Sequence, residues 1–211
     1  MLRLAGMLDS GLQRAINALV EQKPDLARVV VADDERITRL RFDVEEACVG
    51  LLATQQPAAS DLRMVVAAMN IVSDLERMAD HAAGIARMVP RVVGEIPSGW
   101  RVHIERMAET CTSMMRESLE AFVGRDADKA RALAARDDRV DALCSQMFHE
   151  LLGSLAQDAA GPSWTLSLLF AAHSLERTGD RAMSIAERVV FLAGEEMMEL
   201  NPEPWEASSL Q

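Results

Sequence analysis

Apolar residues recur at spacings of three and four along most of the chain, which is the period of a helix with one buried face. Between positions 68 and 89 the alternation of four and three is strict and comprises Ala68, Val72, Leu75, Ala79, Ala82, Ala86 and Val89. This spacing is typical of packed antiparallel helices. Similar stripes predict further helices over 4–19, 24–55, 100–123, from Asp126 to the Gly161–Pro162 break, and over 163–192. The pattern therefore predicts six helices, the third of which begins near Ser60 or Asp61 as its cap.

Helix-breaking residues divide these six helices into two sets of three. Pro90, Gly94 and Pro97, followed by Ser98 and Gly99, form the strongest cluster of such residues in the chain. We therefore expect an all-α protein made of two tandem antiparallel three-helix bundles, over residues 1–95 and 96–195, with an irregular tail over 196–211.

The two halves also resemble each other residue by residue. Segments 73–80 and 173–180 share the pattern Leu-Glu-Arg-x-x-Asp at an offset of 100. Earlier in each half, Asp34 with Ile37 and Leu40 matches Asp137 with Val140 and Leu143 at an offset of 103. Agreement of two motifs in register predicts an internal duplication.

Composition supports a helical fold and narrows the range of partners. The apolar residues, 49% of the chain, are mostly Ala, Leu, Val and Met, and there is no Tyr. The formal net charge of −11 argues against nucleic acid or an anionic membrane as a partner, because both need a basic face. An acidic surface suits cations or basic partner surfaces instead.

The chain has the features of a cytoplasmic protein. No uncharged apolar run approaches the roughly 20 residues that a membrane span needs, and the N-terminal region lacks the pattern of a signal peptide. The three cysteines, Cys48, Cys111 and Cys144, are far apart in helical stretches. We expect packed thiols rather than disulfides or a thiolate metal site.

Carboxylates at matching positions of the two halves are the candidates for chemistry. Glu76 and Asp80 lie four residues apart, as do Glu176 and Asp180, so each pair shares one helix face although like charges repel there. The preceding helix of each half adds further acids, namely Asp34 in the first and Asp137 and Asp141 in the second. In an antiparallel bundle these acids can meet, and carboxylate oxygens bind divalent cations. The pattern therefore predicts one carboxylate cluster on each bundle.

A simpler interpretation is that these acids form ordinary surface ion pairs, with Asp74–Arg77 and Arg177–Asp180 suitably spaced. His81 and His173 could each add a nitrogen ligand, but they occupy different registers in the two halves. The chain contains no Gly-rich phosphate loop, nucleophile elbow or Glu-x-x-His pair, so an enzyme is not expected.

Two features of the sequence resemble the PhoU family. Segment 46–63, which contains Gln56, Pro57, Asp61, Leu62 and Arg63, looks like the hinge between the second and third helices of PhoU proteins. Segments 75–81 and 175–180 resemble the Glu-x-x-x-Asp signatures of the family. The resemblance covers residues 2–192, and the hinge together with the doubled signature is quite specific.

The resemblance implies a non-enzymatic regulator that dampens the phosphate-starvation response. Such a regulator bridges the ATPase subunit of a phosphate ABC transporter and a sensor histidine kinase at the inner membrane, often as a homodimer. It also implies metal sites for iron, zinc, manganese or magnesium, comprising Asp34, Glu76 and Asp80 in the first repeat and Asp137, Asp141, Glu176 and Asp180 in the second. Alternatives are a metal storage or buffering protein and a purely structural bundle.

The chain departs from the family pattern in both repeats. Thr38 stands where the family usually has Asn or Asp, so the first site is expected to be poorer by one ligand. In the second repeat, Gly161–Pro162 replaces the hinge motif.

Overall fold

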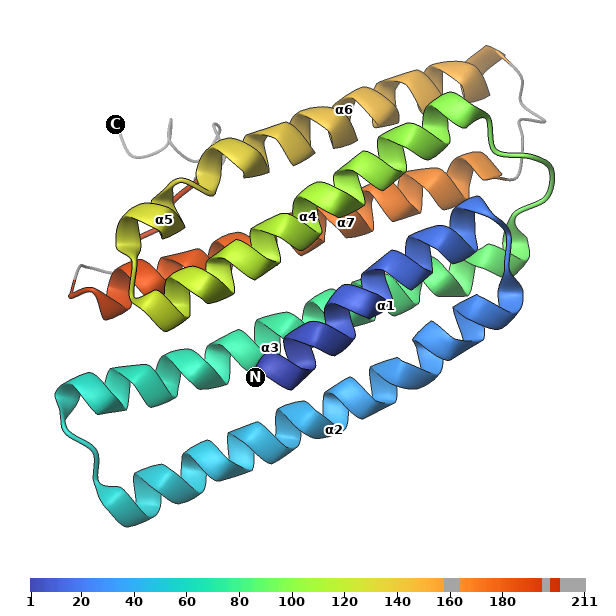
Figure 1. Cartoon of the computed structure of the whole chain (residues 1–211). Coiled ribbons are helices and arrows are strands. Elements are labelled where there is room, and N and C mark those ends of the chain that lie inside the picture. Colours follow the sequence, from blue (N-terminus) through green and yellow to red (C-terminus); the bar gives the residue numbers. More distant parts are fainter. Residues whose placement is uncertain (158–163, 195–197, 202–211) are drawn as a thin grey trace.

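The computed structural model describes residues 1–157, 164–194 and 198–201, and every regular element in these ranges is helical. The elements are α1 (Leu2–Val20), α2 (Pro24–Gln55), α3 (Ala59–Met88), the short 3₁₀ helix η1 (Val89–Arg91), α4 (Ser98–Gly124), α5 (Ala127–Arg131), α6 (Ala134–Gln157) and α7 (Trp164–Leu192). Six of them are long, and Figure 1 shows them as two sets of three that lie side by side. The predicted all-α architecture with an internal duplication is confirmed.

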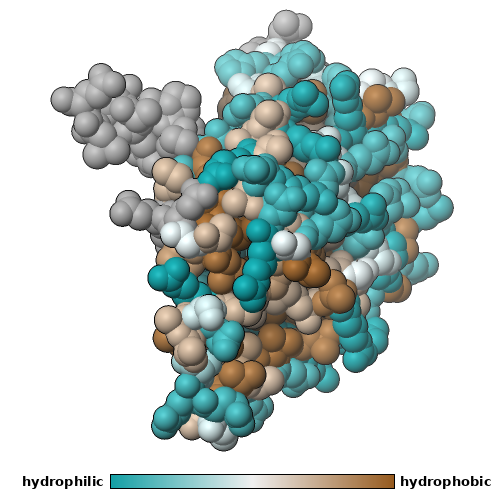
Figure 2. All heavy atoms as spheres, turned by 60° about the vertical axis from the view of Figure 1, so that its left-hand side comes forward, coloured by the Kyte–Doolittle hydropathy of each residue, from teal (hydrophilic) through white to brown (hydrophobic). Residues whose placement is uncertain are grey.

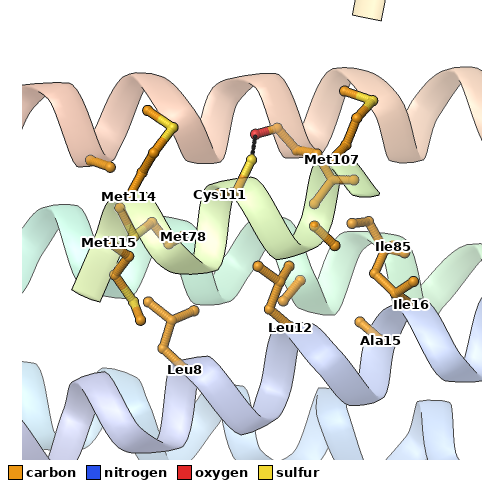
Figure 3. Packing of buried hydrophobic residues seen from close by; sticks show 14 of the residues in the cluster. Leu8, Leu12, Ala15, Ile16, Met78, Ile85, Met107, Cys111, Met114 and Met115 are labelled. Carbon is orange, nitrogen blue, oxygen red and sulfur yellow. Dashed lines mark hydrogen bonds between the residues drawn. The ribbon is translucent and has the colours of Figure 1, made fainter. Parts of the chain in front are cut away.

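The two bundles share one core. Helix α3 packs against α7, and α1 packs against α4, in addition to the contacts within each bundle. Figure 3 shows Leu8 and Leu12 of α1 facing the same interior as Met78 of α3 and Met107 of α4. Cys111 of α4 is also buried there, and its thiol donates to the carbonyl oxygen of Leu175 at 3.1 Å. The repeats are therefore fixed relative to each other by apolar packing.

Two helix starts differ from the sequence-based expectation. Helix α3 begins at Ala59 after an extended Ala58, without a side-chain cap from Ser60 or Asp61, because Gln56 turns the chain with a positive φ of 42°. The single helix expected from Asp126 is divided into α5 and α6. Asp126 does cap α5, accepting a hydrogen bond from the Lys129 backbone N–H at 2.9 Å.

The break between α5 and α6 is held by packing. Ala130 and Leu133, on either side of it, are both buried, and α5 packs against α4 and α7. The new start places Asp137 in the first turn of α6, where a carboxylate interacts favourably with the helix dipole. The Gly161–Pro162 break and nearly all of the predicted tail lie outside the described residues.

The α2–α3 hairpin extends beyond the short helix α1. No residue of α2 after Ile37 is fully buried, because α1 is 19 residues long and α2 is 32. Figure 2 shows hydrophobic side chains in the lower part of one face. The apolar residues exposed on the outer hairpin are Phe42, Val49, Leu51, Leu62 and Val66. None of the described helices carries an apolar stretch that could cross a bilayer.

Candidate metal centre

Three acids of the second repeat meet between α6 and α7. Asp137 and Asp141 come from α6 and Asp180 from α7, and one carboxylate oxygen of each lies within 4.8 Å of the others. Glu176, one turn before Asp180, lines the same groove, which has a volume of about 830 Å³. The structure thus brings together, beside one groove, all four acids predicted for this repeat.

Asp137 is the most buried member of this cluster. Asp137 is only 4% exposed, and its Oδ1 has no hydrogen-bond partner among the described residues. A Cβ atom at Gly179 would lie 2.9 Å from that same oxygen. Only glycine therefore lets α7 approach the carboxylate this closely. A buried carboxylate oxygen without a partner is costly, and a bound cation would satisfy it.

Burial and mutual repulsion raise the proton affinity of the cluster. Burial, together with the nearby charges of Asp180, Asp138 and Glu176, raises the pKa of Asp137 to about 6, although the Asn201 hydrogen bond acts the other way. Burial and Asp180 likewise raise the pKa of Glu176, against the influence of His173. Negative charge is thus incompletely balanced at this site, which favours a cation.

Two basic residues, Arg177 and His173, lie at the edge of the groove. Arg177 forms an ion pair with Asp180 at 2.8 Å, and His173 Nδ1 lies 3.1 Å from Glu176 Oε2. Both side chains are substantially exposed. The surface pair predicted for Arg177 and Asp180 is therefore present beside the cluster, and His173 lies next to a predicted ligand.

The segment after α7 returns across the groove. The Asn201 side-chain amide donates to Asp137 Oδ2 at 3.1 Å, and the Leu200 backbone N–H donates to Glu187 Oε1 at 3.2 Å. Asn201 thereby holds one oxygen of Asp137 and leaves Oδ1 to the cluster. Sequence reasoning missed Asn201, because the segment after α7 carries no periodic pattern, and Glu187 of α7, because it lies outside the shared motif.

The first repeat places its three acids differently. Asp34 on α2 and Asp80 on α3 are joined through Arg87, whose Nη2 lies 3.3 Å from Asp34 Oδ2 and whose Nη1 lies 3.4 Å from Asp80 Oδ1. Burial and Asp80 raise the pKa of Asp34, whereas Arg87 lowers it. An arginine side chain thus lies between the two helices at this cluster.

Glu76, the third acid of the first repeat, also has positive and polar neighbours. The Thr38 hydroxyl donates to Glu76 Oε1 at 3.4 Å, and Arg41 Nε lies 3.6 Å from the same oxygen. Neither contact was anticipated from the sequence, although Thr38 was recognised as a departure from the family pattern.

His81 and Asp74 belong to the interface between the repeats. Burial lowers the pKa of His81, and among the nearby charges that lower it further are Arg181 and Arg177 of α7. Asp74 is 8% exposed and lies 3.7 Å from Arg181. A surface pair was predicted between Asp74 and Arg77. In the structure Asp74 instead pairs with Arg181, and this ion pair joins α3 to α7.

A family model describes both halves of the chain. The model of the PhoU domain matches residues 1–89 and again residues 104–189. The chain belongs to the PhoU family. Each match spans one bundle, with its pair of carboxylate-bearing helices.

Named PhoU relatives cover nearly the whole chain. It is 34% identical over 202 residues to the phosphate-specific transport system accessory protein PhoU homolog of Clostridium acetobutylicum, covering 95% of this chain and 92% of that protein. It is 36% identical over 194 residues to the homolog of Pseudomonas aeruginosa, covering 91% and 80%.

Crystal structures of PhoU proteins show the same fold. For PhoU from Pseudomonas aeruginosa the TM-score is 0.84 at 35% identity, over 92% of this chain and 93% of that one. For the phosphate transport system regulatory protein PhoU from Streptococcus pneumoniae the TM-score is 0.85 at 29% identity, over 93% of both chains.

Proposed function

We propose that this protein is a non-enzymatic regulator of phosphate uptake and phosphate-starvation signalling. Relatives that match over more than nine-tenths of the chain are named as accessory proteins of the phosphate-specific transport system, which supports the proposal. In this role it acts in the cytoplasm, as an adaptor between the transporter ATPase subunit and a sensor histidine kinase, and it forms a homodimer.

The regulatory part of the proposal is tested in the source organism. Deleting the gene is expected to raise expression of a phosphate-responsive reporter in phosphate-rich medium, and the wild-type gene supplied in trans is expected to restore repression. A reporter unchanged by the deletion would overturn the regulatory role. Co-purification with the ATPase subunit and with the kinase tests the adaptor role, and loss of either partner would contradict it.

The regulator also holds a divalent or trivalent metal ion in the second repeat. The ligands are Asp137, Asp141 and Asp180, with Glu176 beside them. The observation that carries this proposal is the buried Oδ1 of Asp137, which lies in a cluster of three carboxylates and has no hydrogen-bond partner in the part of the chain that the structure describes. Oxygen ligands suit manganese, magnesium, iron or zinc. The bound ion supplies positive charge between α6 and α7, so the packing of these two helices depends on metal.

Elemental analysis of protein purified without chelator or affinity metal tests the metal centre. Wild-type protein is expected to contain metal, and Glu176→Gln/Asp180→Asn is expected to contain much less. A matched control is Glu105→Gln/Glu109→Gln, which removes two charges at the same spacing from α4. Equal metal in all three proteins, or none in the wild type after reloading, would overturn the centre. Many ions per chain would instead indicate storage.

A further inference from the structure

We propose that in the first repeat the guanidinium group of Arg87 takes the place of a bound metal ion. Arg87 takes the position between the two acidic helices that a metal ion takes in the second repeat, so the protein binds metal in one repeat only. This inference rests on the metal centre proposed above and revises the expectation of a second metal held by Asp34, Glu76 and Asp80.

Alignment of the two repeats shows at which positions of the cluster they carry the same residue. At offsets of 103 and 100, three acids of the first repeat match three acids of the second: Asp34 with Asp137, Glu76 with Glu176, and Asp80 with Asp180. Arg77 also matches Arg177. The framework of an acidic cluster is therefore common to both halves.

Three positions around the cluster differ so that the first repeat is less negative, whereas Arg181 of the second repeat, which pairs with Asp74, stands for His81 in the first. Thr38 stands for Asp141, Arg41 for Cys144, and Arg87 for Glu187. The first set therefore combines three carboxylates with two guanidinium groups. The six corresponding positions of the second repeat hold five carboxylates and one cysteine, with Arg177 paired to Asp180 at the edge of the groove.

The geometry agrees with this difference in charge. One guanidinium group joins α2 to α3, with Arg87 Nη2 3.3 Å from Asp34 and Nη1 3.4 Å from Asp80. Arg41 lies 3.6 Å from Glu76. Each acid of the first cluster thus has an arginine neighbour, whereas Asp137 of the second cluster has a buried oxygen without a hydrogen-bond partner among the described residues.

An arginine side chain supplies a positive charge that does not dissociate from the protein as a metal ion can. Its guanidinium group stays protonated at every pH at which the protein is folded, and its donors match carboxylate oxygens in direction. A divalent ion at this site would have to displace Arg87 from both acids and lie near Arg41, with repulsion from both. Thr38 offers a neutral hydroxyl where the second repeat offers a carboxylate. The first bundle therefore keeps its packing without metal, and only the second bundle responds to it.

Titration with Mn²⁺, followed by electron paramagnetic resonance of the free ion, tests the inference in the full-length protein. Glu76→Gln/Asp80→Asn is expected to bind as much Mn²⁺ per chain as the wild type, whereas Glu176→Gln/Asp180→Asn loses it. Thr38→Asp/Arg87→Glu places the second-repeat residues in the first repeat. This variant is expected to bind more Mn²⁺ per chain than the wild type, and the increase should be similar to the decrease in Glu176→Gln/Asp180→Asn. The control Arg28→Glu/Thr54→Asp makes the same changes at exposed positions of α2 and is expected to add none.

The outcomes separate the two proposals. Loss of Mn²⁺ from Glu76→Gln/Asp80→Asn would overturn the built-in cation and leave the second-repeat centre standing. A wild type that binds no Mn²⁺ would overturn the second-repeat centre. The inference about Arg87 would then be tested by Thr38→Asp/Arg87→Glu alone: Mn²⁺ binding by this variant would support it, and no binding would overturn it. If that variant does not fold, Arg87→Gln in the Glu176→Gln/Asp180→Asn background replaces it. Recovery of Mn²⁺ binding there supports the inference, and no recovery overturns it.

Discussion

The two repeats build the same pair of acidic helix faces but surround them with different charges. In the first, Arg87 lies between Asp34 and Asp80 and makes two ion pairs. In the second, Glu187 occupies the corresponding position and Asp137 is more deeply buried, with an oxygen left unpaired among the described residues. The duplicated helices keep their acids, and we propose that the charge of a few neighbouring residues determines whether a repeat binds an ion.

The interface between the repeats shows the same divergence. Asp74 and Arg181 form a buried ion pair between α3 and α7. The positions related to them by the duplication carry Ser174 and His81. Of the two pairs of positions that the duplication relates, only Asp74 with Arg181 forms an ion pair, and Ser174 with His81 does not.

The largest effect is expected from breaking that one-sided pair. Arg181→Met leaves the Asp74 carboxylate buried without its closest cation, and we expect a loss of about 2–3 kcal/mol in the free energy of unfolding, measured in urea. The double variant Asp74→Ser/Arg181→His makes the two sides alike. Because it leaves no orphaned charge, it should lose less than the single variant. An equal or greater loss would show that the pair is not what makes the interface asymmetric.

Glycine 179 offers a sharper comparison at the metal centre. In Gly179→Ala the new Cβ would lie 2.9 Å from Asp137 Oδ1 and must displace it. We expect Mn²⁺ affinity to fall about tenfold to a hundredfold, a range typical of changes to the groups that orient metal ligands.

The matched variant in the first repeat is Ala79→Gly. Glycine in a helix interior costs about 0.5–1 kcal/mol, so the free energy of unfolding should fall by that amount while Mn²⁺ affinity stays the same. Mn²⁺ binding that responds equally to both substitutions would contradict the difference between the repeats.

Asp137 should destabilise the metal-free protein at neutral pH. Its folded-state pKa of about 6 lies above the ordinary value of 3.8. The folded state therefore holds the proton more tightly, and stability rises as the pH falls from 7 through 6 toward 4. In chelator at pH 7, Asp137→Asn should gain about 1–2 kcal/mol in the free energy of unfolding.

Asp34→Asn is the control in the first repeat. Arg87 partly offsets the burial of Asp34 and the charge of Asp80, so this substitution should gain less stability than Asp137→Asn or lose some. Denaturation in urea at pH 5 and pH 7 measures both variants. A larger gain from Asp34→Asn would mean that the first cluster carries the greater electrostatic cost.

The smallest effect is expected at Asn201. Asn201→Ala removes a hydrogen bond to the Asp137 carboxylate, and the loss of such a bond should weaken Mn²⁺ binding about threefold to tenfold. Met198→Ala changes an exposed residue of the same segment and should leave the affinity unchanged. Equal effects of the two substitutions would show that the segment acts by covering the groove rather than by holding Asp137.

Helical periodicity was sufficient to predict the long helices and the duplication, because the same stripes that mark them pack into the core. The break between α5 and α6 escaped notice because neither Gly nor Pro occurs between Asp126 and Asp137 to mark it. The uncapped start of α3 depends on the backbone turn at Gln56, which no capping residue announces.

The acids of both clusters could be found from their spacing, but their partners could not. Arg87 is two helical turns from Asp80 and on a different helix from Asp34, so neither local spacing nor the shared motif connects them. The role of Gly179 could not be found from spacing either. Its contact with Asp137 depends on how closely α6 and α7 approach, which only the folded chain reveals.

Anomalous diffraction from crystals of the wild-type protein grown with Mn²⁺ tests the central claim most directly. The account predicts an anomalous peak within coordination distance of Asp137, Asp141 and Asp180, and density for the Arg87 side chain, with no anomalous peak, between Asp34 and Asp80. A peak between Asp34 and Asp80, with Arg87 turned away, would contradict it.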